Sequence, residues 1–340
     1  MLAASEAPLA TAFDLALVDL DGVAYRGPHP IEHAAESLTA ARSSGMKVLF
    51  VTNNASREPE SVADQLTGLG IQAGAADVMT AAQAAAAVLA GRLAPGARVL
   101  VVGGAGLRTA VRAVGLTVVD LADDEPEAVV QGFDPSVSWR ELAQAAYAVQ
   151  RGAWYVASNR DLTLPNEHGL APGNGALVAA VVSATGVEPV SAGKPEPTMY
   201  ELGVKRCGSV RPLVVGDRLD TDLGGAQAAG YPGLHVFTGV SSARDAVLAS
   251  PGERPTFLGA DLRSLLVAHA APEQRADGWW VCGDHAATVR EGGLVLRGST
   301  DPARAAVDLV RAACTAVWTA ADSGQPVDPG TVPDLHVHEP

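Results

Sequence analysis

The sequence has 340 residues, of which 48% are hydrophobic and 18% are charged, so it holds enough apolar material for the cores of two or more domains. Its formal net charge of −14, without any run of lysine and arginine, argues against a nucleic-acid or anionic-membrane partner. Cysteines at 207, 282 and 314 lack Cys-x-x-Cys spacing and indicate neither a disulfide framework nor a zinc site. The sequence shows no export signal and no apolar segment of the roughly 20 residues that span a bilayer, so we expect a cytoplasmic protein.

The first part of the chain, from Phe13 to about Thr80, alternates strand and helix patterns. A short buried strand is followed by a helix with an apolar stripe, a second strand and a second helix, over residues 15–18, 31–44, 48–51 and 59–68. This order predicts a parallel sheet with helices on its faces.

A long insertion separates this part from its continuation. About thirty residues lie between Asp19 and Thr52, just enough for one crossover, whereas roughly 140 lie between Thr52 and Lys194. The longer stretch has strand patterns of its own at 98–102, 117–119, 128–131 and 154–157, and helix patterns at 107–114 and 139–151. We therefore expect an inserted α/β domain over residues 84–189, between two parts of the first domain at 1–83 and 190–268.

The continuation and the C-terminal region differ in their patterns. The first domain resumes with a helix, a strand, a helix and a strand over residues 197–203, 213–215, 221–230 and 233–236, and residues 258–266 complete it. Residues 269–340 form a small α+β extension, with strands at 279–282, 287–290 and 294–297 and an amphipathic helix at 302–321. Trp279, Trp280 and the helix stripe predict packing or a homodimer contact.

Three of the predicted strands of the first domain end in polar segments. Asp19-Leu-Asp21-Gly22 follows strand 15–18, Thr52-Asn53-Asn54 follows strand 48–51, and Gly216-Asp217 with Asp222 follows strand 213–215. A fourth polar segment is Gly193-Lys194-Pro195. Because ligands bind at the carboxyl edge of open α/β sheets, we expect these segments to meet there.

The side chains of the four segments suit phosphoryl transfer. Asp19 can attack a phosphoryl group to form an aspartyl-phosphate, and Asp21 can protonate the leaving alkoxide and then activate water. Thr52, Asn53 and Lys194 can hold phosphoryl oxygens, although a polar Asx turn and an exposed helix-start lysine are the structural alternatives. Each segment alone also fits a solvated turn, but all four in this order do not.

The carboxylates also suit a divalent cation. Mg²⁺ prefers a few carboxylates together with water and substrate oxygens in an octahedral shell. Asp19, Asp217 and the main-chain carbonyl of Asp21 fit that shell, with Asp222 bonding a metal-bound water or Lys194. Such an ion would let the anionic nucleophile approach an anionic substrate.

In these four motifs the chain resembles the haloacid dehalogenase superfamily phosphatases, and its insertion resembles the C2 cap of the NagD-like subgroup. Ser158-Asn159-Arg-Asp161 and Asn174-Gly175 also fit that subgroup. The resemblance implies a Rossmann-like α/β core with a parallel sheet, an inserted α/β C2 cap and a small C-terminal extension. The resemblance implies that Asp19 and Asp21 are catalytic and that substrate phosphate is bound by Thr52, Asn53, Asn54 and Lys194. It also implies that Mg²⁺, for which Co²⁺ or Mn²⁺ can substitute, is bound by Asp19, Asp21 and Asp217. Asp222 would support the bound metal.

The whole chain resembles the actinobacterial D-glycerol-3-phosphate phosphatases, and its extension resembles part of an acetyltransferase-like fold. This implies hydrolysis of glycerol 3-phosphate in glycerophospholipid recycling, with a small phosphorylated metabolite as partner. The alternatives are a phosphatase of a nucleotide, sugar or pyridoxal phosphate, and an inactive protein that binds a phospho-ligand.

Two further segments invite a functional interpretation. Gly103-Gly104-Ala105-Gly106 resembles a dinucleotide-binding turn, but Thr109 stands where the third Gly or Ala is required, so we interpret these glycines as packing residues. The loop over residues 162–175 is a candidate lid, beside which Asn159 and Asp161 are candidates for contact with polyol hydroxyls.

Overall fold

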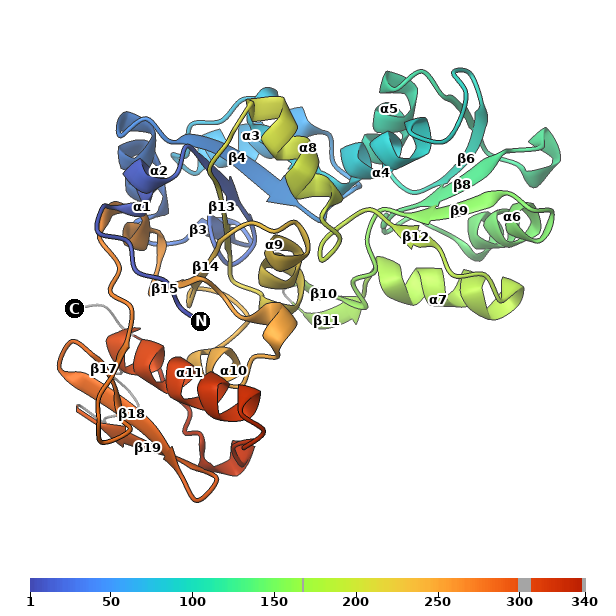
Figure 1. Cartoon of the computed structure of the whole chain (residues 1–340). Helices are drawn as coiled ribbons and strands as arrows, with labels where there is room; N and C mark the ends of the chain where they lie inside the picture. The colour runs from blue at the N-terminus through green and yellow to red at the C-terminus, as the bar shows by residue number, and fades with distance from the viewer. Residues whose placement is uncertain (167, 299–306, 338–340) are drawn as a thin grey trace. The chain divides into compact units, whose positions relative to one another are not determined.

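The computed structural model describes residues 1–166, 168–298 and 307–337 (Figure 1). The chain divides into two compact units: a first unit of Met1–Leu49 with Val204–Pro340, and a second unit of Phe50–Gly203. The division falls within a strand, β4 (Lys47–Thr52), and within a helix, α8 (Thr198–Cys207). In the part of the chain that the structure describes, we find no helix with the length and apolar character needed to cross a membrane.

A six-stranded sheet has the order β15-β14-β13-β1-β4-β5. Its strands besides β4 are β1 (Leu15–Val18), β5 (Val78–Thr80), β13 (Pro212–Gly216), β14 (Gly233–Val236) and β15 (Phe257–Gly259). The pairs β1·β13, β13·β14, β14·β15 and β4·β5 are parallel. Every residue of β1 and β13 is buried, which explains why these strands appear in the sequence as uninterrupted apolar runs. The predicted parallel α/β sheet is confirmed.

Short helices and one hairpin complete the core of the first unit. They are α1 (Leu9–Ala12), β2 (Tyr25–Arg26), β3 (His29–Pro30), α2 (Ala34–Ser43), α9 (Gly224–Ala228), α10 (Ala243–Val247) and single 3₁₀ turns at Pro251–Glu253 and Leu262–Leu266. The helix predicted from residue 221 differs from the structure, where one π turn over Leu219–Leu223 precedes α9. Such turns are frequent at functional sites, and this one contains Asp222.

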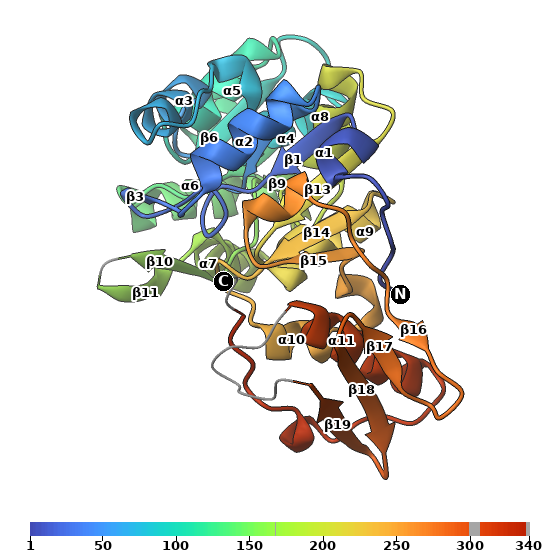
Figure 2. The ribbon, with the colours of Figure 1, turned by 90° about the vertical axis from the view of Figure 1, so that its left-hand side faces the viewer.

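The C-terminal extension is an antiparallel sheet with one long helix. Its elements are β16 (Glu273–Gln274), β17 (Trp280–Cys282), β18 (His285–Arg290), β19 (Gly293–Arg297), α11 (Val307–Asp322) and a 3₁₀ turn at Pro329–Thr331. Helix α11 lies between this sheet and α10 (Figures 1 and 2). The Trp318 side chain is buried there, and its Nε1–H donates to the Ala246 carbonyl (3.2 Å).

Two tryptophans of the extension have packing roles, as the sequence predicts. The Trp279 ring is buried, with the Arg297 guanidinium 4.1 Å from its centroid. Trp280 packs against the cluster formed by α10 and α11. Residues 302–306 of the predicted helix lie outside the described residues, and the homodimer contact stays a prediction.

The second unit contains a five-stranded parallel sheet with the order β12-β9-β8-β6-β7. Its strands are β6 (Arg98–Val102), β7 (Thr117–Val119), β8 (Ala128–Gln131), β9 (Trp154–Ala157) and β12 (Val190–Ser191). The helices of the second unit are α3 (Pro59–Gly68), α4 (Ala81–Ala90), α5 (Ala105–Ala113), α6 (Trp139–Gln150) and α7 (Asn174–Thr185). The unit also has 3₁₀ turns at Ala75–Asp77 and Ala122–Asp124. Helices α6 and α7 pack on one face of the sheet, and α4 and α5 lie on the other (Figure 1).

Several elements of the second unit differ from the sequence expectations, among them the short strands β5 and β12, which were not expected. Helices α4 and α7 were not expected, because their apolar residues do not gather on one face and so give no clear helical stripe. A local signal for α4 did exist, the capping box in which Thr80 and Gln83 exchange hydrogen bonds. The expected loop at 162–175 contains an antiparallel hairpin, β10 (Thr163–Asn166) with β11 (Gly169–Pro172), whose prolines obscure the strand pattern.

Candidate active site

Three carboxylates come together in the first unit. One ligand oxygen from each of Asp19, Asp217 and Asp222 lies within 4.8 Å of the other two. Asp19 follows β1 and Asp217 follows β13, and in this parallel pair Val18 lies opposite Val215. The Asp19 N–H donates to the Val215 carbonyl (2.9 Å), so the residues that follow the two strands lie side by side. The predicted meeting of these three carboxylates is confirmed.

Asp217 is fully buried and closely enclosed. The Val240 N–H donates to its Oδ2 (2.6 Å), and the Ser241 N–H donates to its carbonyl oxygen (3.1 Å). A Cβ atom placed on Gly239 would lie 1.8 Å from the same Oδ2, and one on Gly22 would lie 2.5 Å from it. Gly22 also has φ +85, a conformation that favours glycine. The carboxylate therefore occupies space that only two glycines leave open.

Asp222 is positioned by the π turn. Its Oδ2 accepts from the Arg218 N–H (3.2 Å), and its own N–H donates to the Arg218 carbonyl (2.9 Å). A Cβ on Gly216 would lie 2.2 Å from the Asp222 Cβ, so glycine is needed for this close approach. The neighbouring Asp220 is exposed and forms an ion pair with the Arg218 guanidinium (2.7 Å). The turn thus directs one carboxylate into the cluster and the other to solvent.

Asp21 has a different environment from Asp19. Asp19 is half-buried, whereas Asp21 is exposed, in a turn that the Gly22 N–H closes by donating to the Tyr25 carbonyl (2.8 Å). The Thr238 hydroxyl donates to the Gly22 carbonyl (2.6 Å) and ties this turn to the segment that encloses Asp217. An exposed carboxyl group can exchange protons with water, as an acid/base group must.

A buried histidine that the sequence did not reveal supports the segment after β14. The His235 Nε2–H donates to the Ser241 carbonyl (3.2 Å), and its ring packs edge-on against Phe237. Burial is the main cause that lowers the pKa of His235 to about 4, so the ring is neutral at pH 7. It holds Ser241, whose N–H bonds Asp217.

In the second unit, Asn53 and Lys194 form a two-bond pair. The Lys194 N–H donates to Asn53 Oδ1 (2.9 Å), and Asn53 Nδ2 donates to the Lys194 carbonyl (3.2 Å) and to Asp161 Oδ2 (3.1 Å). The Lys194 side chain is buried, and its Nζ donates to the Val51 carbonyl (3.3 Å). The exposed helix-start alternative for this lysine is therefore wrong.

The other polar residues after β4 form a local turn. Thr52 Oγ1 accepts from the Asn54 N–H (3.1 Å), and Asn54 Oδ1 accepts from the N–H groups of Ser56 (2.9 Å) and Arg57 (3.1 Å). This is an Asx turn, which the sequence left open as an alternative. The side-chain oxygen of Asn54 therefore accepts hydrogen bonds from neighbouring main-chain N–H groups, although the residue itself is exposed.

Asn159 and Asn174 extend the contacts of Asn53. Asn159 Nδ2 donates to the Asn53 carbonyl (2.8 Å), and its Oδ1 accepts from the Asp161 N–H (3.1 Å). Asn174 Nδ2 donates to the Asn159 carbonyl (2.7 Å). Asn159 is buried with both ends of its amide bonded to protein, so the expectation that it contacts polyol hydroxyls is not supported.

The glycines at 103–106 have a packing explanation. A Cβ on Gly106 would lie 2.4 Å from the Arg57 carbonyl oxygen, and one on Gly104 would lie 3.0 Å from the Ser56 carbonyl oxygen. The start of α5 therefore lies against the main chain of residues 56–57. This supports the interpretation of these residues as packing glycines.

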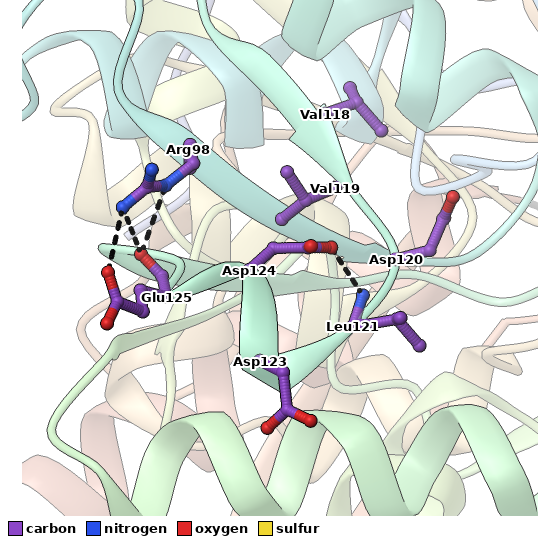
Figure 3. A pocket seen from close by; sticks show the side chains of 8 residues that line it. All are labelled: Arg98, Val118, Val119, Asp120, Leu121, Asp123, Asp124 and Glu125. Atoms are coloured by element: carbon purple, nitrogen blue, oxygen red, sulfur yellow. Dashed lines mark hydrogen bonds and ion pairs between the residues drawn. The ribbon is translucent and has the colours of Figure 1, made fainter.

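A pocket of about 510 Å³ lies beside β7 in the second unit (Figure 3). Its lining contains four carboxylates, three of which form ion pairs: Asp120 with Arg108 (2.7 Å), Asp123 with Arg151 (2.9 Å) and Glu125 with Arg98 (3.5 Å). None of the eight lining residues belongs to the expected site. We assign this pocket no function.

Comparisons with known proteins agree with this geometry. The sequence matches the family of haloacid dehalogenase-like hydrolases over residues 16–117, a HAD-hydrolase-like family over 191–265 and a GCN5-related N-acetyltransferase like domain over 282–334. It is 49% identical to the D-glycerol 3-phosphate phosphatase of Mycobacterium tuberculosis in an alignment of 320 residues. This alignment covers 92% of this chain and 88% of that protein. An acid sugar phosphatase of Staphylococcus saprophyticus is 37% identical over 74% of this chain and 95% of its own length.

Solved structures show the same similarity. The glycerol phosphate phosphatase of Mycobacterium tuberculosis in complex with magnesium matches with a TM-score of 0.83 at 46% identity, over 92% of each chain. The p-nitrophenyl phosphatase of Archaeoglobus fulgidus matches with a TM-score of 0.69 at 28% identity, over 75% of this chain and 98% of that one. The chain therefore belongs to the haloacid dehalogenase-like hydrolases. The resemblance drawn from the four motifs is confirmed.

Proposed function

We propose that this protein is an Mg²⁺-dependent phosphatase that hydrolyses glycerol 3-phosphate to glycerol and phosphate. The observation that carries the chemistry is the convergence of Asp19, Asp217 and Asp222 within 4.8 Å. The substrate is supported by the 49% identity with a D-glycerol 3-phosphate phosphatase over 92% of the chain. The similarity includes part of the C-terminal extension, since the 8% of the chain outside this alignment is shorter than residues 269–340.

The carboxylate cluster fits a magnesium ion. Mg²⁺ binds oxygen at about 2.1 Å, so ligand oxygens lie up to about 4.2 Å apart, near the 4.8 Å limit within which the three oxygens lie. Asp19, Asp217 and the Asp21 carbonyl would hold the ion, and the position of Asp222 in the cluster supports a direct or water-mediated bond. When bound, the ion supplies positive charge that polarises the phosphoryl group and offsets the acidic site.

Two aspartates carry out the chemical steps of this proposal. A carboxylate oxygen of Asp19 attacks phosphorus, the bond to the alkoxide breaks, and the Asp21 carboxyl group gives its proton to the leaving oxygen. The Asp21 carboxylate then accepts a proton from water as the water attacks the aspartyl-phosphate. This breaks the bond between phosphorus and Asp19, releases phosphate and restores both residues.

The polar residues of the second unit hold the phosphate in this proposal. The Lys194 ammonium and the Thr52 hydroxyl would bind phosphoryl oxygens. Since both ends of the Asn53 side-chain amide bond protein groups, we propose that Asn53 contributes its main-chain N–H group. The Asn54 main-chain N–H donates to Thr52 Oγ1, so we propose that Asn54 contributes its side-chain Nδ2. The substrate would be a small phosphorylated metabolite in the cytoplasm, and a homodimer would involve the extension.

A panel of phosphate esters tests the function. It compares kcat/KM for both enantiomers of glycerol 3-phosphate, sugar phosphates, a nucleotide and pyridoxal phosphate, with Mg²⁺, Mn²⁺ or Co²⁺. We expect glycerol 3-phosphate to be preferred by at least tenfold. Preference for a sugar phosphate would instead favour the activity named for the staphylococcal relatives.

The Asp19→Asn variant tests the mechanism. We expect it to release no phosphate from any ester on the panel, because an amide cannot form the aspartyl-phosphate. Turnover by Asp19→Asn would exclude this mechanism. Absence of turnover by the wild-type protein, with retained binding of phosphate, would identify an inactive phospho-ligand-binding protein.

A further inference from the structure

We propose that Asn53, Asn159 and Asn174 are positioning residues that fix the main chain of Lys194 through a relay of amide hydrogen bonds. The proposal rests on the proposed function, in which Lys194 binds the phosphoryl group. All of the residues of the relay lie in the second unit.

The first link of the relay is the pair between Asn53 and Lys194. One primary amide accepts from the lysine N–H (2.9 Å) and donates to its carbonyl (3.2 Å), which fixes both the position and the orientation of that residue. A Cβ on Gly193 would lie 2.8 Å from Asn53 Oδ1, so glycine is needed before Lys194 for this approach. The lysine side chain is only 4% exposed, so a displaced main chain leaves little room for the side chain to compensate.

The second link holds Asn53 itself. Asn159 donates to the Asn53 carbonyl (2.8 Å) and accepts from the Asp161 N–H (3.1 Å). The Asp161 carboxylate in turn accepts from Asn53 Nδ2 (3.1 Å). Asn53, Asn159 and Asp161 therefore form a closed ring of hydrogen bonds at the base of the β10–β11 hairpin.

The third link anchors Asn159 to the sheet and to α7. Asn174, the first residue of α7, donates from Nδ2 to the carbonyls of Asn159 (2.7 Å) and Gln131 (3.4 Å). Two carbonyl acceptors fix which end of this amide is the nitrogen. The Asn174 side chain is 1% exposed, so water cannot replace these bonds. A Cβ on Gly175 would lie 2.2 Å from the Arg160 carbonyl, which requires glycine after Asn174.

This arrangement requires amides. An aspartate at position 174 has almost the same shape as asparagine but would direct carboxylate oxygens at two carbonyl oxygens. The relay would open at its anchor, and Lys194 would lose its fixed position without being substituted itself. We expect weaker binding of the phosphoryl group as the result.

The experiment uses the full-length protein with Mg²⁺ and p-nitrophenyl phosphate as substrate. We expect Asn174→Asp to lower kcat/KM about tenfold and to raise the inhibition constant of inorganic phosphate by a similar factor, with the half-saturating Mg²⁺ concentration unchanged. Ser183→Ala is the control, because it removes an exposed hydroxyl from the same helix. A lower Tm with unchanged kinetic constants would show a structural role only and would overturn the proposal.

A double-mutant cycle tests whether the effect passes through Lys194. In a Lys194→Ala background, Asn174→Asp should change kcat/KM by less than twofold, because the group that it positions is absent. A second tenfold loss in that background would overturn the proposal. If Asn174→Asp does not fold, Asn159→Asp replaces it, because this variant keeps the acceptor for the Asp161 N–H and loses only the donor to Asn53.

Calorimetric titration with inorganic phosphate separates this proposal from the proposed function, because it needs no turnover. If the wild-type protein fails to hydrolyse any ester, the proposed function fails, and the relay is then tested by phosphate affinity alone. Equal affinities of wild type and Asn174→Asp would overturn the relay even if the wild type is an active phosphatase.

Discussion

Gly239 and Asp217 approach each other so closely that a Cβ atom on Gly239 would lie 1.8 Å from Oδ2 of the carboxylate. The same oxygen accepts a hydrogen bond from the N–H of Val240, the next residue (2.6 Å). The segment after β14 therefore determines the position of a proposed metal ligand that is more than twenty residues away in the sequence.

The first prediction concerns Gly239→Ala. The added methyl group must displace the Asp217 carboxylate, so we expect kcat/KM to fall about 100-fold and the half-saturating Mg²⁺ concentration to rise, while the circular dichroism spectrum stays unchanged. Gly252→Ala is the matched control, because a Cβ there meets nothing within 4 Å. Wild-type Mg²⁺ dependence in Gly239→Ala would contradict the proposed role of Asp217.

The second prediction compares two aspartates of the same turn. Asp222→Asn removes a buried carboxylate from the cluster and should raise the half-saturating Mg²⁺ concentration by about tenfold or more. Asp220→Asn removes an exposed carboxylate that pairs with Arg218 and should change that concentration by less than twofold. Mg²⁺ titrations of activity measure both variants, and equal effects would show that the cluster does not bind the metal as proposed.

The third prediction concerns the attachment of α11. The Arg311 guanidinium donates to Asp308 Oδ1 (2.7 Å), to the Leu258 carbonyl (2.8 Å) and to His269 Nδ1 (3.0 Å). We expect Arg311→Met to lower the free energy of unfolding by about 2 to 3 kcal/mol, because it leaves partly buried acceptors unpaired. Urea unfolding measures this loss. Arg275→Met, at an exposed position of the same extension, should change stability by less than about 0.5 kcal/mol.

The fourth prediction concerns the pH dependence of stability. Burial is the main cause that lowers the pKa of His269, and its neutral ring accepts from Arg311 while its Nε2–H donates to the Ser264 carbonyl (2.7 Å). The unfolded chain binds a proton near pH 6.5 and the folded chain does so only at lower pH. The stabilisation is therefore complete above pH 6.5 and is lost as pH falls below it.

Thermal unfolding between pH 7 and pH 4 checks this prediction. The His269→Gln variant should lose less stability over this range than the wild type does. His235, whose pKa burial lowers to about 4, contributes in the same direction and is present in both proteins, so part of the decline should remain. Parallel pH profiles of the two proteins would contradict the assignment to His269.

Much of the fold was predictable because its signals are local. Strands β6, β8, β9 and β14 have the predicted bounds, since a buried parallel strand is a short apolar run whose ends are marked by polar residues. The edge strand β7, which is not buried, also has the predicted bounds. Helices α4 and α7 were missed because their apolar residues are not confined to one stripe. Hydrophobic periodicity predicts a helix only where one face of the helix is buried. It gives no signal for a helix whose apolar residues lie on several faces.

The sequence alone determined which carboxylates come together: Asp19 and Asp217 directly follow strand ends, Asp222 lies a few residues further on, and parallel pairing brings such positions to one edge. Only the tertiary structure decided how these residues are held. The contact of Gly239 with Asp217, the support of Ser241 by His235 and the bidentate pair of Asn53 with Lys194 join residues that are distant in the chain. No local pattern encodes these contacts, because each depends on the close packing of elements that meet only after the chain has folded.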